Sequence, residues 1–112
     1  EDMDSSIQDS RVKKIIEEIN KRYTDKISLG DLADECGLSI GHLSTLIKKE
    51  TGQSFSEYIT GKRMEDAKKL LCREELSIDE VADMVGYHDY FYFTKAFKKY
   101  VGMSPSMYRK SI

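Results

Sequence analysis

The sequence has little of what marks several protein classes. Its 112 residues include one proline, no tryptophan and only two cysteines. No apolar run approaches the ~18–20 residues that a membrane span requires, and no basic-then-apolar signal segment opens the chain. Cys36 and Cys72 stand alone, so we expect two buried thiols in a protein of the reducing cytosol rather than a disulfide framework.

The motifs of catalysis are also missing. The sequence contains no Cys-x-x-Cys, no histidine pair at metal-ligand spacing and no glycine-rich phosphate loop. It also shows no nucleophile beside a general base. We therefore expect no enzymatic activity, no metal and no cofactor.

What is present favours helix. Hydrophobic residues make up 39% of the chain and charged residues 34%, with many Lys, Glu, Leu, Ile and Ala. The length suits one modest domain, or two very small ones sharing a core. Hydrophobic periodicity predicts an all-α fold of about seven helices without a convincing strand.

The charge is unevenly distributed. The net charge of −2 argues against a nucleic-acid partner when it is taken as a whole. Residues 1–36 hold 10 acidic and 6 basic residues, a net charge of −4. Residues 37–112 hold 10 acidic and 12 basic residues, a net charge of +2. The acidity is therefore concentrated at the N-terminal end, although the remainder is not strongly basic.

The most informative feature is an internal duplication, in which residues 28–58 and 77–108 carry one pattern. At an offset of 49, Ser28, Ala33, Asp34 and Gly37 match Ser77, Ala82, Asp83 and Gly86. At an offset of 50, Lys48, Lys49, Gly52, Ser54 and Tyr58 match Lys98, Lys99, Gly102, Ser104 and Tyr108. One extra residue therefore lies in a turn of the second copy. Two copies are too few for a solenoid.

Each copy reads as a helix, a glycine turn and a second helix, the helix-turn-helix arrangement. A first helix is expected near Asp9 or Ser10, after a polar tail at residues 1–8. Its apolar face is Val12, Ile15, Ile16, Ile19 and Tyr23. Capping patterns begin at Ser28, Ser54 and Ser77, and Ser104-Pro105 opens the last helix.

In a DNA-binding helix-turn-helix, the N-terminal part of the second helix meets base edges in the major groove. Leu43, Leu46 and Ile47 face the core by periodicity, as do Phe93, Ala96 and Phe97. The candidate DNA-binding residues are Ile40, Gly41, Ser44, Thr45, Lys48 and Lys49 in the first copy, and Tyr90, Phe91, Thr94, Lys95, Lys98 and Lys99 in the second.

The chemistry of these residue types suits DNA. Ser and Thr bond to bases or phosphates, Lys donates to guanine, and apolar Ile40 and Phe91 can touch a thymine methyl. Helix N-termini and lysines can hold phosphates without a large total charge. The alternative for Lys48, Lys49, Lys98 and Lys99 is an ordinary solvated face, which their recurrence in both copies disfavours.

Neighbouring aromatic and histidine residues have competing interpretations. Tyr92 and Phe93 are expected in the core, whereas at least one of Tyr90 and Phe91 must be exposed. We expect His42 to have a packing role and His88, in the turn, to be solvated.

At these residues the chain resembles the AraC/XylS family of bacterial transcription regulators over nearly all of residues 10–110. The resemblance is carried by LADECGLSIGHLSTLIKKETGQSFSEYI, KRMEDAKKLL and IDEVADMVGYHDYFYFTKAFKKYVGMSPSMYR. It implies two helix-turn-helix subdomains, at 9–53 and 74–112, joined by a linker helix at 54–73. That helix would hold both recognition helices on one side of the DNA, in major-groove segments about 34 Å apart.

The resemblance implies further expectations about partners. Double-stranded DNA and RNA polymerase would be partners in the bacterial cytoplasm. Arg63 matches a family arginine, with a structural or phosphate-contacting role. Such domains usually follow a ligand-binding or receiver domain, and the start at Glu1 rather than Met fits a domain cut from such a regulator. The isolated piece is expected to be monomeric.

The first recognition helix departs from the common family pattern. Thr45 stands where a long polar or basic residue is frequent, and neither Ile40 nor Gly41 adds a donor. The second recognition helix is therefore expected to dominate base readout. A helical protein-interaction module without DNA binding is the alternative function, supported by the net acidity and the exposed aromatic residues.

Overall fold

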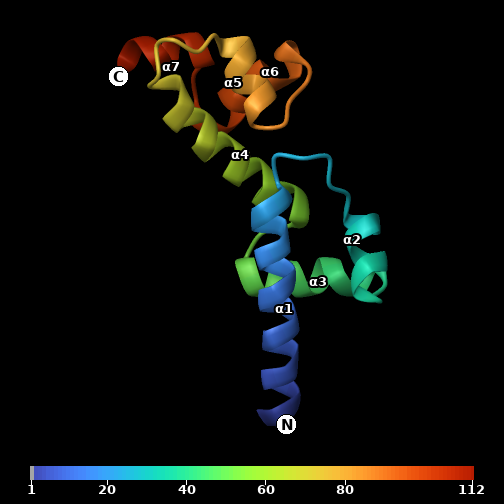
Figure 1. Ribbon diagram of the computed structural model, residues 1–112. Helices are drawn as coiled ribbons and strands as arrows, with labels where there is room; N and C mark the ends of the chain where they lie inside the picture. Colours follow the sequence, from blue (N-terminus) through green and yellow to red (C-terminus); the bar gives the residue numbers. More distant parts are fainter. Residues whose placement is uncertain (1) are drawn as a thin grey trace. The chain divides into compact units, whose positions relative to one another are not determined.

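A computed structural model describes the backbone of residues 2–112 and the side chains of residues 11–112. These residues form seven α helices and no strand, as the sequence predicts (Figure 1). The helices are α1 (Asp2–Arg22), α2 (Leu29–Cys36), α3 (Ile40–Thr51), α4 (Phe55–Leu71), α5 (Ile78–Met84), α6 (Tyr90–Val101) and α7 (Pro105–Ser111).

The chain divides into two compact units, Glu1–Ile59 and Thr60–Ile112, with the border inside α4. The core of the first unit consists of Ile15, Ile19, Leu32, Ala33, Leu43, Ile47 and Ile59. The core of the second consists of Met64, Ala67, Leu71, Val81, Ala82, Val85, Tyr87, Phe93 and Phe97. The two parts of α4 therefore belong to different cores.

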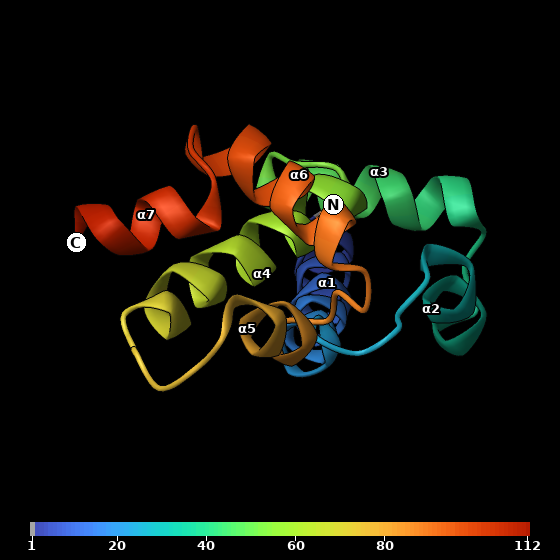
Figure 2. The same ribbon diagram turned by 90° about the horizontal axis from the view of Figure 1, so that it is seen from above.

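In the first unit α3 packs against both α1 and α2 (Figures 1 and 2). Polar contacts hold the rims of this core together. The Arg22 guanidinium donates to both carboxylate oxygens of Glu35, at 2.9 and 3.3 Å, and so ties α1 to α2. Tyr58 Oη donates to Asn20 Oδ1 at 2.9 Å, which ties α4 to α1.

In the second unit α6 packs between α5 and α7. The Phe93 and Phe97 rings lie 5.8 Å apart, and Tyr108 of α7 meets Phe97 edge-on at 5.6 Å, a favoured aromatic geometry. Arg109 Nε donates to the carbonyl oxygen of Leu71 at 2.9 Å, and its Nη2 donates to that of Arg73 at 3.1 Å. Arg109 thereby satisfies the carbonyl of Leu71, the last residue of α4, and adds a second bond to the Arg73 carbonyl, which also accepts the Leu76 N–H.

The helix ends follow the capping residues of the sequence. Ser54 and Glu57 form a reciprocal capping box at α4, as Ser77 and Glu80 do at α5. At α2 only the forward bond is present, from the Asp31 N–H to Ser28 Oγ. Gly37 ends α2 with a φ of 70°, a left-handed conformation that strains residues with a side chain.

Two expectations about the fold are wrong. The first helix begins at Asp2 rather than near Asp9 or Ser10, because residues 2–10 contain neither Gly nor Pro to break it. The side chains of the expected tail at residues 1–8 lie outside the described residues. Cys72 is exposed, since it follows the last turn of α4. Cys36 is only half-buried, and burial raises the pKa of its thiol.

Among the described residues, no helix combines the length and the apolarity needed to cross a membrane.

Replacing Ser77 with Ala removes the acceptor for the Glu80 N–H and breaks the capping box of α5. We expect the free energy of unfolding to fall by about 1 kcal/mol, measured by urea denaturation. Ser56→Ala is the matched control, because Ser56 is exposed in the first turn of α4 and its side chain makes no hydrogen bond among the described residues. Equal losses for the two variants would contradict a capping role.

The same box predicts a pH dependence. The backbone N–H and then the side chain of Ser77 lower the pKa of Glu80 below its ordinary value. Its stabilisation is therefore present above the unfolded-state pKa, about 4.3, and is lost as pH falls through the folded-state pKa. Glu80→Gln, which keeps an acceptor, should destabilise the protein at pH 6 but not at pH 3. Glu74→Gln, at an exposed glutamate outside the box, should show no such difference between the two pH values.

Candidate nucleic-acid interface

The second helices of the two copies present their residues in the same way. From residue 41 to 50 and from 91 to 100, the order of exposed, half-buried and buried positions is identical. The buried positions are Leu43 and Ile47 in α3, and Phe93 and Phe97 in α6, all fully covered. Since these pairs are four residues apart, they fix one face of each helix in the core and leave the opposite face exposed.

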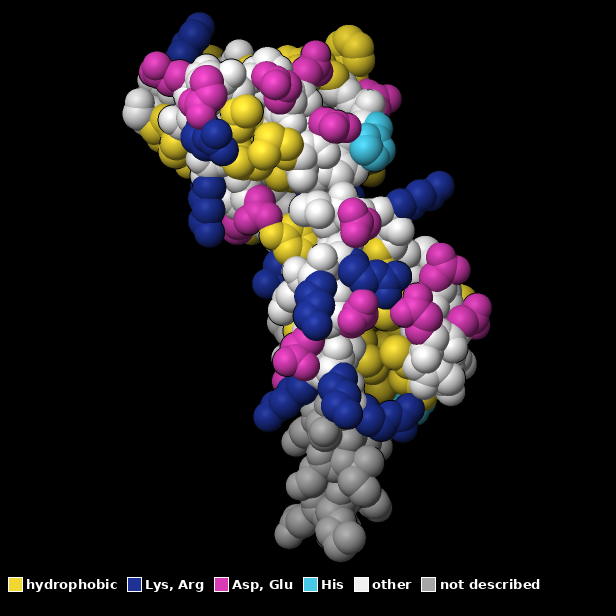
Figure 3. Space-filling view, in the orientation of Figure 1, with side chains coloured by type: hydrophobic (Ala, Val, Ile, Leu, Met, Phe, Trp, Pro, Cys, Tyr) yellow, Lys and Arg dark blue, Asp and Glu magenta, His cyan; other side chains and the backbone are white. Residues whose placement is uncertain are grey.

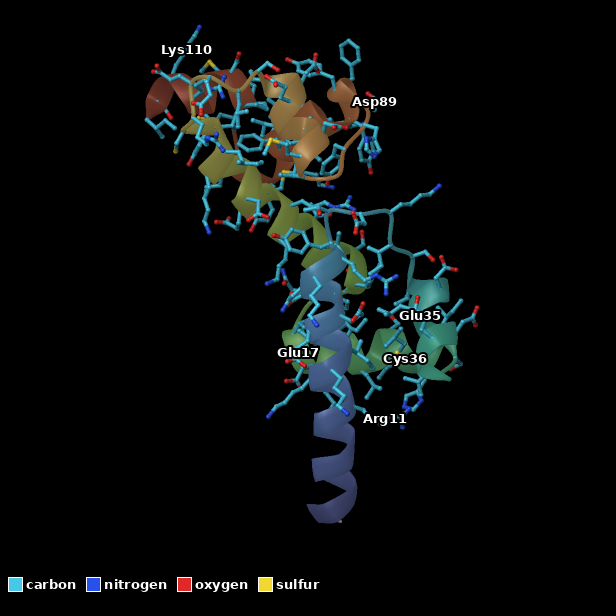
Figure 4. The ribbon with its side chains drawn as sticks, in the orientation of Figure 1. Arg11, Glu17, Glu35, Cys36, Asp89 and Lys110 are labelled. Carbon is cyan, nitrogen blue, oxygen red and sulfur yellow. The ribbon has the colours of Figure 1, made fainter. Side chains whose placement is uncertain are left out.

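The two helices begin with different caps. Ser39 Oγ accepts the N–H of His42 at 3.1 Å, so α3 starts with a neutral group. Asp89 Oδ1 accepts the N–H of Phe91 at 2.9 Å and that of Tyr92 at 3.1 Å. A carboxylate therefore stands at the start of α6, where Figure 4 labels it. A negative charge at this end is stabilised by the helix dipole.

The outward face of α3 offers few free polar groups. Thr45 Oγ1 donates to the carbonyl oxygen of Gly41 at 2.9 Å, so its hydroxyl hydrogen is already used within the helix. The Ile40 side chain is 56% exposed and leans toward α2. Its Cδ1 lies 3.7 Å from the point where a Cβ on Gly30 would stand. Apart from its lysines and the exposed His42, this helix therefore has little with which to read a base.

The first turn of α6 is strongly aromatic. Phe91 is 81% exposed, and Tyr90, 39% exposed, meets its ring edge-on at 5.7 Å. The prediction that at least one of this pair is exposed is confirmed. The prediction that Tyr92 belongs to the core is wrong, because one residue before Phe93 turns it about 100° around the helix. Its ring rests against Tyr87 at 5.8 Å and is 64% exposed.

The prediction for one histidine is wrong and the prediction for the other is confirmed. His42 is exposed, so the expected packing role is wrong; it precedes the buried Leu43 and points away from the core. His88 is solvated as expected, and its Nδ1 lies 2.8 Å from Asp83 Oδ1 at the surface.

Two of the candidate polar residues are less exposed to solvent than helical periodicity predicts. Ser44 and Thr94 occupy equivalent positions and are both half-buried. The Thr94 Oγ1 atom is fully covered and has no hydrogen-bond partner among the described residues. The outward orientation expected for the Thr94 hydroxyl is therefore wrong, since it lies at the boundary of the face that buries Phe93 and Phe97.

The candidate lysines are all exposed, at Lys48, Lys49, Lys95, Lys98 and Lys99. The helix α6 contains three of them and no acidic residue, whereas α5 contains Asp79, Glu80 and Asp83. On the face shown in Figure 3, basic and acidic side chains are interspersed without a large field of one sign. Positive charge is therefore local to individual helices, and α7 likewise carries Arg109 and Lys110 without an acidic residue.

Two arginines make contacts that stabilise the second unit. The Arg63 guanidinium lies over the Tyr87 ring, 5.2 Å from its centroid, in cation–π geometry. Tyr87 is buried at the turn before α6, so Arg63 supports that turn. The bonds of Arg109 to α4 were not anticipated, because nothing in local spacing predicts a contact 38 residues away. No cluster of three metal-ligating side chains occurs within the described part of the chain.

Comparison with known proteins agrees with this geometry. A family model described as a helix-turn-helix domain matches residues 32–111. The raffinose operon transcriptional regulatory protein RafR of Pediococcus pentosaceus is 43% identical over 94 residues, which cover 84% of this chain and 34% of that protein. The chain thus spans about a third of the length of this curated relative.

Two solved structures are also similar. The C-terminal domain of the response regulator YesN from Fusobacterium nucleatum has a TM-score of 0.82 at 42% identity, covering 87% of this chain and 95% of that one. The C-terminal domain of the response regulator AraT from Geobacillus stearothermophilus has a TM-score of 0.86 at 39% identity, covering 91% and 85%. With its duplicated helix-turn-helix and seven helices, the chain belongs to the AraC/XylS family of helix-turn-helix regulators.

Proposed function

We propose that this chain is the DNA-binding output domain of a longer bacterial transcription regulator and that it recognises specific double-stranded sequences. The observation that carries the proposal is the matched exposure of α3 and α6, each anchored by a buried pair and free along the opposite face. A helix presented in this way fits the major groove, whose base edges distinguish all four base pairs. The two copies would contact one duplex twice.

Unequal roles for the two helices follow from their side chains. In α3 the Thr45 hydroxyl hydrogen is engaged and Ile40 leans on α2, so its main donors are Lys48, Lys49 and the exposed His42. In α6 an exposed lysine, Lys95, follows the aromatic first turn by one helical turn. We propose that α6 supplies most of the sequence discrimination and that α3 mainly positions the domain through phosphate contacts.

Local charge accounts for binding despite a net charge of −2. Lys48 and Lys49 lie in the last turn of α3, and Lys98 and Lys99 in the last turn of α6. Interactions between exposed charges are screened beyond roughly 10 Å at moderate salt. Acidic residues elsewhere in the chain therefore oppose phosphate contacts only weakly.

The curated relative is longer than this chain, which supports a larger regulator that contains this domain. We propose an upstream sensory domain, of the receiver type suggested by the two response-regulator neighbours. Residues 9–53 and 74–112 would then act as the DNA-binding subdomains and residues 54–73 as their linker. RNA polymerase would be the partner through which binding in the cytoplasm alters transcription.

Binding should depend steeply on salt. Each neutralised phosphate contributes about −0.9 to the slope of log affinity against log salt concentration. Replacing both Lys98 and Lys99 with Ala should therefore flatten the slope by about 1.8, measured by fluorescence anisotropy on a duplex selected from a random library. Lys13→Ala, at an exposed lysine of α1, should leave the slope unchanged. A chain that binds no duplex at low salt would refute the proposed function and favour a protein-interaction module.

The unequal roles of the helices can be tested directly. We expect Lys95→Ala to weaken binding to the selected duplex more than Thr45→Ala does, because the Thr45 hydroxyl already bonds within its helix. The loss for Lys95→Ala should be about 1–3 kcal/mol if it contacts a base, and near zero for Thr45→Ala. A larger loss for Thr45→Ala would reverse the assignment.

A further inference from the structure

We propose that the first turn of α6 reads a thymine methyl group, with Phe91 as the contacting side chain and Asp89 as a positioning residue. This inference rests on the proposed function and specifies the base chemistry of one half of the recognised site. It adds an apolar contact to a helix whose other exposed candidate residues, Tyr90 and the lysines, are hydrogen-bond donors.

The exposure of Phe91 is the starting point. It is 81% exposed, the largest exposed fraction among the exposed large hydrophobic residues of the described chain. It occupies the second position of α6, within the part of a recognition helix that meets base edges. The major groove offers one apolar group at base edges, the C5 methyl of thymine.

The Phe91 ring and backbone already have partners within the protein before any ligand arrives. Its backbone N–H is bonded to Asp89 Oδ1 at 2.9 Å, which fixes the start of the helix. Its ring meets Tyr90 edge-on at 5.7 Å, so one side of the ring is supported by the protein. A pre-positioned side chain loses little conformational entropy on binding.

Asp89 disfavours contact between this turn and the phosphates of the DNA backbone. The N-terminus of a helix otherwise attracts phosphate, because its free N–H groups and dipole favour an anion. At α6 the carboxylate already takes the N–H groups of Phe91 and Tyr92, and its charge repels phosphate. The turn is thereby suited to uncharged base edges, whereas the neutral Ser39 of α3 imposes no such restriction.

The first copy provides the internal comparison. Gly41 stands at the position equivalent to Phe91, at an offset of 50, and has no side chain to offer. Ile40, equivalent to Tyr90, leans on Gly30 of α2. Methyl reading from the second position of the helix should therefore be confined to the half of the site that α6 contacts.

The experiment removes single methyl groups from the DNA. The probe is a synthetic duplex selected by the 112-residue chain from a random library, with each thymidine replaced in turn by deoxyuridine, which pairs identically but lacks the methyl. We expect affinity to fall about fourfold at one or two positions, equivalent to the ~0.8 kcal/mol gained by burying one carbon group of this size. At these positions Phe91→Ala should bind both duplexes equally.

Matched variants distinguish a loss of methyl recognition from a loss of folding. Phe91→Leu, still apolar, should retain part of the discrimination. Met107→Ala, at another exposed apolar residue, should retain all of it. Asp89→Ser, which copies the cap of α3, should keep the helical circular-dichroism signal, bind random duplex more tightly and reduce the discrimination.

The failures of the two proposals look different. Specific binding that is insensitive to every deoxyuridine, discrimination that survives Phe91→Ala, or a selected site without thymine overturns the methyl reader while leaving the DNA-binding function intact. Failure to select any sequence from the library overturns the function itself.

Discussion

The structure depends on a buried pair four residues apart in the second helix of each copy. Leu43 and Ile47 anchor α3, and Phe93 and Phe97 anchor α6, with none of the four reaching solvent. Each pair fixes the rotation of its helix about its own axis, and rotation decides which side chains a ligand can meet. Truncation of such a side chain typically costs about 2–5 kcal/mol, so the exposed face is specified by the hydrophobic core beneath it.

Local sequence signals predicted most of this fold because they act locally. Serine caps, glycine ends and helical periodicity operate within a few residues, and duplication supplied each of them twice. Predictions for single residues were wrong where the chemical type of a side chain was given more weight than its position around the helix axis. Tyr92 is aromatic but lies one residue before Phe93, so it turns outward and remains 64% exposed with its ring against Tyr87. Contacts between distant segments, such as Arg109 with Leu71, leave no local pattern to read.

Acidic residues and DNA binding are compatible here because several of the acids serve the fold. Glu57 and Glu80 accept backbone N–H groups at helix starts, and these bonds lower the pKa of each. Glu35 is engaged by Arg22, and that pairing raises the pKa of the arginine. Their charges are committed to helix caps and tertiary contacts, while the last turns of α3 and α6 carry paired lysines. Net charge alone is therefore a poor guide to the partner of such a domain.

In the two copies, the buried positions that determine folding are the same, whereas the exposed positions that would contact a ligand differ. The buried pattern of α3 and α6 is identical, yet their exposed first turns differ in almost every chemical respect. The cap is neutral at Ser39 and charged at Asp89, and the following residues change from Ile40-Gly41 to Tyr90-Phe91. Such changes leave the core untouched, because an exposed position contributes little to stability. One scaffold can therefore hold two readers of different chemistry, and the recognised sequence need not be symmetric.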